Sequence, residues 1–211
     1  MRNRTIGKRL VYGAGVNDAD YQLKVYDYLG AKPRLVSSCP FYSRWKDMLK
    51  RCYCDGYQAR NPTYKGCTVV PEWLCFMQFR KWMSEQEWQG KQLDKDLLFP
   101  GNKVYGPDTC VFLDASVNYF ITESTSARGK WPIGVCFSKS AKRFQARCSS
   151  VISHRKVILG SFKDPDEAHA AWLAYKREQA WILASQQNDP RIAAALIARY
   201  ENYTDSAARA A

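Results

Sequence analysis

The chain has 211 residues, of which 32 are Lys or Arg and 20 are Asp or Glu, so its formal net charge is +12. With 46% hydrophobic and 14% aromatic residues, it can fill one or two small cores, which excludes disorder as the state of its middle part. No apolar run approaches the roughly 18 residues of a membrane helix, and the basic N-terminus lacks the apolar stretch of a secretory signal. The composition therefore favours a cytoplasmic protein with a polyanionic partner and no membrane partner, although solubility alone would also account for the charge.

The N-terminal half begins with a basic arm, residues 1–38, in which only residues 21–29 have the pattern of a strand. This arm either follows a nucleic-acid backbone or is a frayed chain end. Over residues 40–53, apolar side chains recur at steps of three and four, which predicts a helix with one apolar face. A short strand is expected over residues 67–70. Pro71 then opens a second helix, whose aromatic stripe is typical of a core.

The eight cysteines have a spacing that argues against structural zinc. Cys52 and Cys54 are separated by a single residue, whereas zinc knuckles usually separate their paired thiols by about two to four residues. The alternative is a zinc site whose four thiols converge only in the fold, those of Cys39, Cys52, Cys54 and Cys67. Because the cysteines stand in apolar or strand-like segments, we expect reduced and largely buried thiols.

The middle of the chain predicts a strand, an irregular loop, a second strand and a helix, in that order. Residues 92–99 are strand-like, turns follow at Gly101 and Gly106, and residues 110–113 form an apolar strand. Residues 115–121 predict the start of a short helix. The small, polar segment 124–130 is the best candidate for a linker.

Beyond this linker, three short strands are expected over residues 134–138, 144–149 and 156–162. An amphipathic helix follows, opened by Asp164-Pro165, because proline and acidic side chains suit the first turn of a helix. A last helix over residues 190–200 is rich in alanine and is expected to be peripheral. These elements predict a small three-stranded sheet backed by one helix.

The predicted sheet has a one-sided charge pattern. Residues 124–163 contain nine Lys or Arg and no Asp or Glu. In the second predicted strand, apolar residues alternate with long polar ones, in the order Arg143, Phe144, Gln145, Ala146, Arg147 and Cys148. One face is therefore expected to be apolar and the other cationic. Such a ribbon suits the major groove of DNA, where Arg and Gln contact base edges and Lys contacts phosphate; a solvated charged face is the alternative.

Residues 131–185 resemble the APETALA2-type DNA-binding domain. The resemblance is carried by Ile133-Gly-Val, Phe144-Gln-Ala-Arg, Lys156-Val-Ile-Leu-Gly-Ser-Phe and Asp166-Glu-Ala-His-Ala-Ala-Trp. It implies a three-stranded sheet that enters the major groove of double-stranded DNA. Base or phosphate contacts are then assigned to Lys139, Arg143, Gln145, Arg147, Arg155 and Lys156. Ile158 stands where the plant domains usually have tryptophan, so their target sequence is not carried over.

The middle of the chain is similar to the HNH nucleases, or ββα-metal fingers, that phage homing endonucleases pair with such a module. The resemblance is carried by Gln92-Leu-Asp-Lys-Asp-Leu, the loop 99–107, Thr109-Cys-Val-Phe-Leu and the helix 115–121. It implies one divalent cation, Mg²⁺ or Mn²⁺, at the scissile phosphate. Asp94 from the strand and Asn118 from the helix would hold this metal, with Asp96 as a competing or additional ligand.

The base that activates water is where this chain departs from the HNH pattern. The family's catalytic histidine falls on Lys95, and both histidines of the chain lie in the other module. Lys95 could act as the base if burial and neighbouring charges favour its neutral form, or it could only bind phosphate. A third alternative is that the metal and a carboxylate activate water without it. The family's middle asparagine falls near Thr109, and Asn102 in the loop is a candidate substitute.

We therefore expect an α+β protein that joins a ββα-metal finger to a three-stranded antiparallel sheet with one helix. Its parts are a basic arm 1–38, an HNH-like nuclease domain 39–123, a linker 124–130, an APETALA2-like domain 131–185 and a C-terminal helix 186–211. The first functional reading is a phage-encoded, site-specific DNA endonuclease that uses a divalent metal. The second is a non-catalytic duplex-binding protein or regulator, favoured by the missing histidine. The third, an RNA-associated protein, is weakened because the ribbon lacks aromatic stacking residues.

Overall fold

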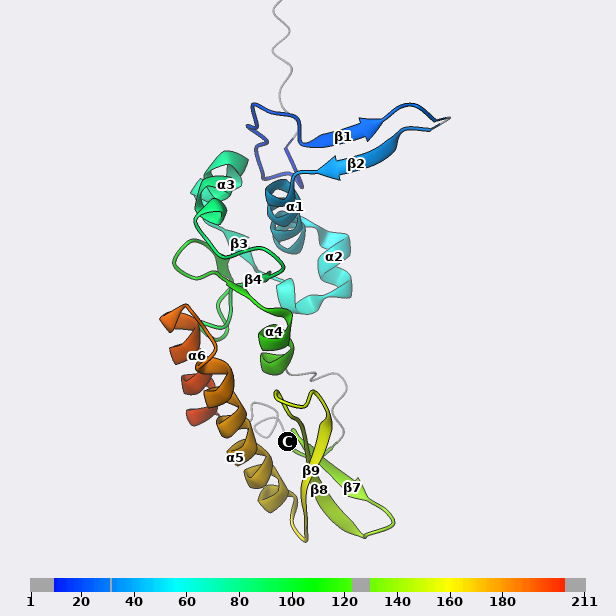
Figure 1. Cartoon of the computed structure of the whole chain (residues 1–211), viewed down its shortest axis with the longest axis vertical. Coiled ribbons are helices and arrows are strands. Elements are labelled where there is room, and N and C mark those ends of the chain that lie inside the picture. The colour runs from blue at the N-terminus through cyan, green and yellow to red at the C-terminus, as the bar shows by residue number, and fades with distance from the viewer. Residues whose placement is uncertain (1–9, 31, 123–129, 204–211) are drawn as a thin grey trace, which may run out of the picture. The chain divides into compact units, whose positions relative to one another are not determined.

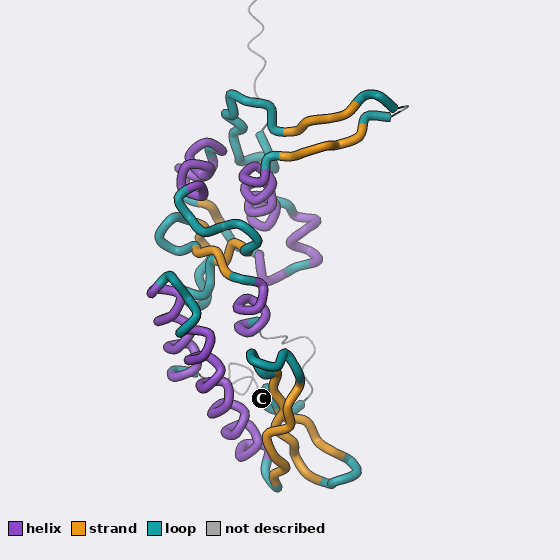
Figure 2. The backbone as a smooth tube through the Cα atoms, in the orientation of Figure 1, coloured by secondary structure: helices purple, strands orange, loops and turns teal. Residues whose placement is uncertain are grey.

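The computed structural model of the chain describes residues 10–30, 32–122 and 130–203. These residues form an α+β protein of small sheets and six α-helices (Figure 1, Figure 2). The chain divides into two compact units, Met1–Leu113 and Asp114–Ala211. Within the described ranges, no helix is both long enough and apolar enough to span a membrane.

The first unit begins with a β-hairpin and continues with helices and two further small sheets. Its elements are β1 (Lys24–Asp27), β2 (Arg34–Ser38), α1 (Pro40–Tyr53), α2 (Asp55–Arg60), a 3-10 helix Pro62–Tyr64, β3 (Thr68–Val69), a 3-10 helix Pro71–Leu74, α3 (Phe76–Ser84), β4 (Gln92–Asp94), β5 (Val104–Tyr105) and β6 (Val111–Leu113). β1 pairs antiparallel with β2, β3 pairs parallel with β5, and β4 pairs antiparallel with β6.

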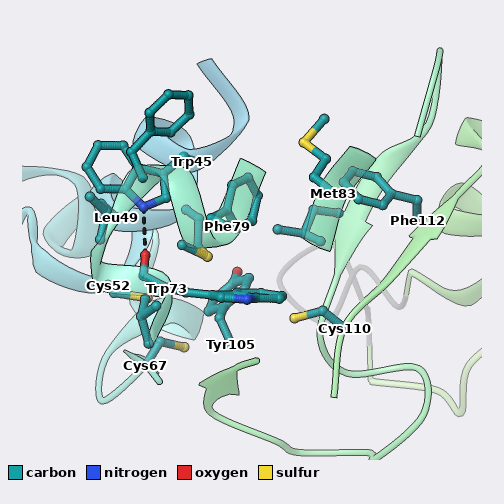
Figure 3. Packing of buried hydrophobic residues seen from close by; sticks show 14 residues of the cluster. Trp45, Leu49, Cys52, Cys67, Trp73, Phe79, Met83, Tyr105, Cys110 and Phe112 are labelled. Carbon is teal, nitrogen blue, oxygen red and sulfur yellow. Dashed lines mark hydrogen bonds between the residues drawn. The ribbon is translucent and has the colours of Figure 1, made fainter. Parts of the chain in front are cut away.

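Aromatic side chains from α1, α3 and the turn before α3 form the core of this unit (Figure 3). The indole N–H of Trp45 donates to the carbonyl of Trp73 at 2.7 Å, so a fully buried donor is satisfied. Trp73 in turn packs edge to face on Phe79, with ring centroids 5.1 Å apart. The helix predicted for residues 40–53 is confirmed, and the aromatic stripe lies in the core.

The second predicted helix begins later than its proline suggests. Pro71 opens a 3-10 helix that ends at Leu74, and α3 starts only at Phe76. Val16 donates its N–H to the carbonyl of Leu74 and accepts the N–H of Phe76, at 2.8 and 3.1 Å. A segment from far earlier in the chain thus takes the backbone groups that would otherwise continue one helix.

Strand β4 is shorter than the expected range 92–99. In addition, the sequence pattern did not predict β2 as a separate strand or α2 as a helix. β4 ends because the carboxylate of Asp94 accepts the N–H groups of Asp96 and Leu97, at 2.9 and 2.7 Å, and turns the chain. β2 and α2 bury no residue, so neither shows the alternation or helical spacing that marks a packed face.

The second unit contains a three-stranded antiparallel sheet of order β7-β8-β9 with a long helix packed on it. Its elements are α4 (Ala115–Ile121), β7 (Val135–Ser138), β8 (Arg143–Ser149), β9 (Lys156–Phe162), α5 (Pro165–Ala184) and α6 (Pro190–Glu201). The strands begin and end within a residue of the predicted ranges. The expected linker 124–130 lies outside the described residues except for its last position.

Small side chains allow α5 to lie close to the sheet. Ala146 and Cys148 of β8 pack with Ala168 and Trp172 of α5 in the core of this unit. Gly134, just before β7, has φ +81°, and a Cβ at this position would lie 2.1 Å from the Trp172 ring. Glycine is required here because it adopts a left-handed backbone without strain and because it has no Cβ to collide with the indole.

Helix α6 forms a helical hairpin with α5, and together they hold α4. The carbonyl of Phe120 in α4 accepts hydrogen bonds from the ammonium of Lys176 at 2.8 Å and the hydroxyl of Tyr200 at 3.1 Å. Arg199 donates to the carbonyl of Ile121 at 3.1 Å. Two cations thereby donate hydrogen bonds to carbonyls at the C-terminal end of α4, where the last carbonyls of a helix have no N–H partner within the helix. α6, expected to be peripheral, instead contributes buried residues to this core.

We predict that Gly134→Ala destabilises the second unit by about 2 to 5 kcal/mol, the sum of left-handed strain and a clash in a packed core. The control is Gly66→Ala in the first unit, where φ is +75° but nothing lies within 4 Å of the new Cβ. Gly66→Ala should therefore destabilise the protein only by the strain of a left-handed backbone, about 1 to 2 kcal/mol. Urea unfolding followed by circular dichroism measures both, and equal losses would contradict the role of the Trp172 contact.

Candidate nuclease site and nucleic-acid interface

Asp94 stands at the end of β4 with its carboxylate half-buried. Burial raises the pKa of Asp94, and the N–H groups of Leu97 and Asp96 on Oδ2 offset part of this rise. Among the residues that the structure describes, none donates a hydrogen bond to Oδ1. Asp94 therefore keeps one oxygen for a cation, and a cation there would relieve part of the desolvation cost of its charge.

Lys95 is buried, with only 5% of its surface exposed. Its ammonium group forms an ion pair with the carboxylate of Asp96 and donates to the carbonyl of Asn102 at 2.7 Å. The ring centroid of Tyr105 lies 5.9 Å from Nζ. The side chain is thus enclosed by its own loop and by β5.

Asn102 closes the loop that contains Lys95. Its side-chain amide donates to the carbonyls of Lys95 and Val104 at 2.9 and 2.7 Å, and its Oδ1 accepts the N–H of Val104 at 3.1 Å. The hydroxyl of Thr109 also donates to the Val104 carbonyl, at 2.8 Å. Lys95 and Asn102 are therefore joined by hydrogen bonds in both directions. Asn102 stabilises the loop, and its role as a substitute for the middle asparagine of the HNH nucleases stays a prediction.

These contacts bear on the roles that the sequence left open for Lys95. A general base must present a lone pair to water, whereas this ammonium directs its N–H groups at two acceptors. A phosphate ligand must be accessible, whereas the side chain is 6% exposed. The geometry favours a structural cation that stabilises the loop after β4. Of the three mechanisms considered for water activation and phosphate binding, only activation of water by a metal and a carboxylate needs no catalytic role for Lys95.

Oxygen ligands near the end of β4 come from Asp94 and Asp96. Asp96 is 51% exposed, and one of its oxygens is engaged by Lys95. In the described ranges, no group of three or more His, Cys, Asp or Glu side chains is placed to hold a metal ion. Mg²⁺ commonly binds one or two carboxylates and completes its shell with waters and substrate phosphate. The Asp94 and Asp96 carboxylates fit that sparse type of site, and their hard oxygens suit Mg²⁺ or Mn²⁺.

All eight cysteines are free thiols. Cys52, Cys67 and Cys110 lie within the aromatic core of the first unit (Figure 3). Burial raises the pKa of Cys52 and that of Cys110 to about 12. Zinc binds the thiolate form, so an apolar environment of this kind disfavours it as a ligand.

Asn118 belongs to a different unit from the other three predicted catalytic residues. It lies on α4 of the second unit, whereas Asp94, Lys95 and Asp96 are consecutive in the first. Its carbonyl accepts the N–H and the hydroxyl of Thr122, at 3.2 and 2.7 Å, where α4 ends. Asp94, Lys95 and Asp96 are neighbours because they are consecutive in the chain, and Asn118 as a metal ligand stays a prediction from the sequence.

The exposed face of the β7–β9 sheet is the second candidate site. On β8, Ala146 and Cys148 are buried, whereas Arg143 and Arg147 are exposed. The predicted alternation is confirmed, and a bulge lies between Ala146 and Arg147. Gln145 is half-buried, and the other predicted DNA-contacting side chains are exposed, namely Lys139, Arg143, Arg147, Arg155 and Lys156.

Arg147 lies at the centre of this face. Its guanidinium donates to Oε1 of Gln145 at 2.7 Å, and across the strand pair it stands opposite Ile158. Ile158 is 58% exposed. In a major groove, arginine typically recognises guanine, glutamine recognises adenine, and an aliphatic group packs against the methyl group of thymine. Three chemistries of base recognition therefore lie next to one another.

Acidic side chains are kept off this face. In the described part of the second unit, all of them cap a helix or lie within one: Asp114, Asp164, Asp166, Glu167, Glu178, Asp189 and Glu201. None of the six predicted contact residues forms an ion pair with another described residue. Lys142 and Lys163 are also exposed, just before β8 and just after β9. Strand alternation did not indicate these two lysines as contact residues, whereas the absence of Asp and Glu from residues 124–163 did point to them.

Comparison with models of protein families, with curated proteins and with solved structures gives no match to this chain. The resemblances to the APETALA2-type domain and to the HNH nucleases therefore rest on the quoted motifs and on the order of the elements. The evidence for function is therefore the chemistry of two sites, the Asp94 carboxylate and the exposed face of the β7–β9 sheet.

We predict that Lys95→Met destabilises the first unit by about 1 to 3 kcal/mol, because the Asn102 carbonyl loses its donor and Asp96 its partner. Lys65→Met is the control, since Lys65 is exposed and a surface change of this kind usually stays within about 0.5 kcal/mol. Urea unfolding measures both variants. A Lys95→Met protein as stable as the control would show that the lysine does not hold the loop.

Proposed function

We propose that this protein binds double-stranded DNA through the exposed face of the β7–β9 sheet and carries a divalent-metal nuclease site at Asp94. The observation that supports it most is the two-faced sheet. One face is buried on α5, and the other presents exposed cations with no acidic side chain among them. Solubility is served by mixed charges, whereas a surface of one sign is typical of a polyanion-binding site.

The residues on this face divide into two kinds of contact. Lys139, Arg155 and Lys156 lie at the turns or strand ends and suit phosphate oxygens, which position a protein on the duplex. Arg147, with Gln145 and Ile158 beside it, suits base edges in the major groove, which is wide enough to admit a β-ribbon. This arrangement supports sequence-selective binding rather than charge attraction alone.

The nuclease part of the proposal centres on the Asp94 carboxylate. Asp94 and Asp96 would hold Mg²⁺ or Mn²⁺, which supplies a Lewis acid for a phosphate oxygen and lowers the pKa of a bound water. Lys95 and Asn102 keep the two carboxylates in place by closing the loop between β4 and β5. The corresponding biological role is that of a phage-encoded homing endonuclease in the cytoplasm of its bacterial host.

A second candidate function is duplex binding without cleavage, as in a regulator. Two observations favour it. The ammonium of Lys95 is engaged where the HNH family has its histidine. His169, one of the two histidines, lies in the second unit with Nδ1 hydrogen-bonded to the Ile133 carbonyl at 2.9 Å. Cleavage assays separate the two functions, because both share the same DNA-binding face.

For the sheet face, we predict that Arg147→Ala weakens duplex binding by about 1 to 3 kcal/mol, a factor of roughly 5 to 150 in affinity, and relaxes sequence preference. Lys156→Ala should weaken binding to all sequences and reduce the salt dependence of log K by about one unit. Fluorescence anisotropy with labelled duplexes at several salt concentrations measures both effects.

The matched control removes the same charge elsewhere. Lys65→Ala and Lys81→Ala change exposed cations of the first unit, and together they lower the net charge as much as Arg147→Ala with Lys156→Ala. We expect the sheet pair to lose much more affinity. An equal loss in both pairs would mean that net charge, and not this face, binds DNA.

For the nuclease site, we predict that Asp94→Asn abolishes cleavage in Mg²⁺ or Mn²⁺ and leaves duplex binding unchanged. Asparagine keeps an oxygen for the N–H groups of Asp96 and Leu97 but removes the charge that binds the metal. Nicking of supercoiled plasmid and of phage DNA measures cleavage, and a chelator should stop the wild-type reaction.

Two outcomes are decisive. Wild-type protein that binds duplex but cuts no DNA with either metal would establish the non-catalytic function. Metal-dependent cleavage that persists at the wild-type rate in Asp94→Asn would place the nuclease site elsewhere in the chain.

A further inference from the structure

We propose that the β1–β2 hairpin inserts its tip into the DNA minor groove and bends the duplex. This inference rests on the proposed function, because it requires a protein that binds duplex DNA. It adds a second DNA-contacting element, in the first unit, which neither the sheet of the second unit nor the nuclease site explains.

The hairpin exposes apolar side chains on both faces and at its tip. Leu29 is 97% and Tyr28 is 72% exposed, and both lie directly after β1. Leu35 pairs with Tyr26, the residue after Val25, so Val25 and Leu35 point to opposite faces of the ribbon, and both are exposed. Figure 2 shows the two strands as a ribbon that projects from the rest of the first unit. A large unpacked apolar surface of this kind marks an interaction site.

The base of the hairpin is firmly attached to the unit. Cys39 donates its N–H to the carbonyl of Leu23 at 2.8 Å, and both side chains pack on the aromatic core. Tyr21 lies 6.4 Å from Phe76 between ring centroids, with the guanidinium of Arg80 over it at 5.0 Å. A ribbon that is fixed at one end and unpacked at the other transmits a contact at its tip to the whole unit.

The tip is shaped to present its apolar residues. Asp27 accepts the N–H of Leu29 on its carboxylate at 2.9 Å, which turns the chain directly after β1. This hydrogen bond engages the one acidic side chain of the hairpin. Lys32 and Arg34 lie beside the tip, Lys24 lies at the base of the hairpin opposite Ser38, and all three are exposed.

This combination favours DNA over a second copy of the chain. Minor-groove proteins insert apolar side chains between base steps while nearby Lys and Arg neutralise phosphates, and the duplex then bends away from the wedge. Pairing of two such hairpins would bring like charges together, since each carries three cations against one acid. A tip of tyrosine and leucine with two cations beside it therefore fits a groove lined with phosphates.

The test is ligase-mediated circularisation of A·T-rich duplexes of about 100 bp, which are shorter than the persistence length of about 150 bp and close slowly unless bent. The test variant is Tyr28→Ser with Leu29→Ser. The control is Trp181→Ser, which removes an aromatic side chain that is 56% exposed on α5. Anisotropy measures binding to the same duplexes, and sedimentation velocity measures the oligomeric state.

We expect wild type and Trp181→Ser to accelerate circularisation by about tenfold or more, and the hairpin variant to lose this effect while its affinity falls by less than about fivefold. Saturating the duplex with the minor-groove ligand netropsin should also remove the acceleration. A hairpin variant that circularises DNA as well as wild type overturns the inference. So does a wild-type dimer that the hairpin variant converts to monomer. If wild type binds no duplex at all, the proposed function fails as well, which anisotropy alone reveals.

Discussion

The period of two in β8 is the constraint on which the exposed cationic face of the β7–β9 sheet depends. Ala146 and Cys148 must point into the core because α5 lies directly over them, so Arg143 and Arg147 have no choice but the opposite face. A shift of one residue would bury two guanidinium groups under a helix, at a cost that no partner there could offset. Core packing and the cationic surface are therefore two consequences of one strand register.

The loop after β4 works on a different principle. Its centre is the buried ammonium of Lys95, which contacts a carboxylate, a carbonyl and the face of a tyrosine ring. Asn102 completes the arrangement by binding the backbone on both sides of the loop. The neighbouring Asp94 is left half-buried, with its pKa raised by burial and one oxygen open to a cation. A half-buried carboxylate in a loop closed by hydrogen bonds is the feature on which the proposed divalent-metal site depends.

The candidate sites are divided between the two units. The first carries the carboxylates and the hairpin, and the second carries the sheet face and α4, whose carbonyls are held by Lys176 and Arg199. The predicted order of strand, loop, strand and helix is present along the chain, and the boundary between the units falls between β6 and α4, which carries Asn118. The candidate metal site and the candidate DNA-binding face thus lie in separate units.

Periodicity determined much of this protein from its sequence alone. The helix from Pro40, the three strands of the second unit and the faces of β8 follow from which residues alternate, because burial of one face leaves a regular pattern. The sequence could not show that Val16 would split the second helix, that β1 and β2 would pair without burying a face, or that Lys95 would turn inward to Asn102. Each of these depends on groups brought together by the fold. Hydrogen bonds between distant backbone and side-chain atoms leave no period in a sequence, and so only the tertiary structure decided them.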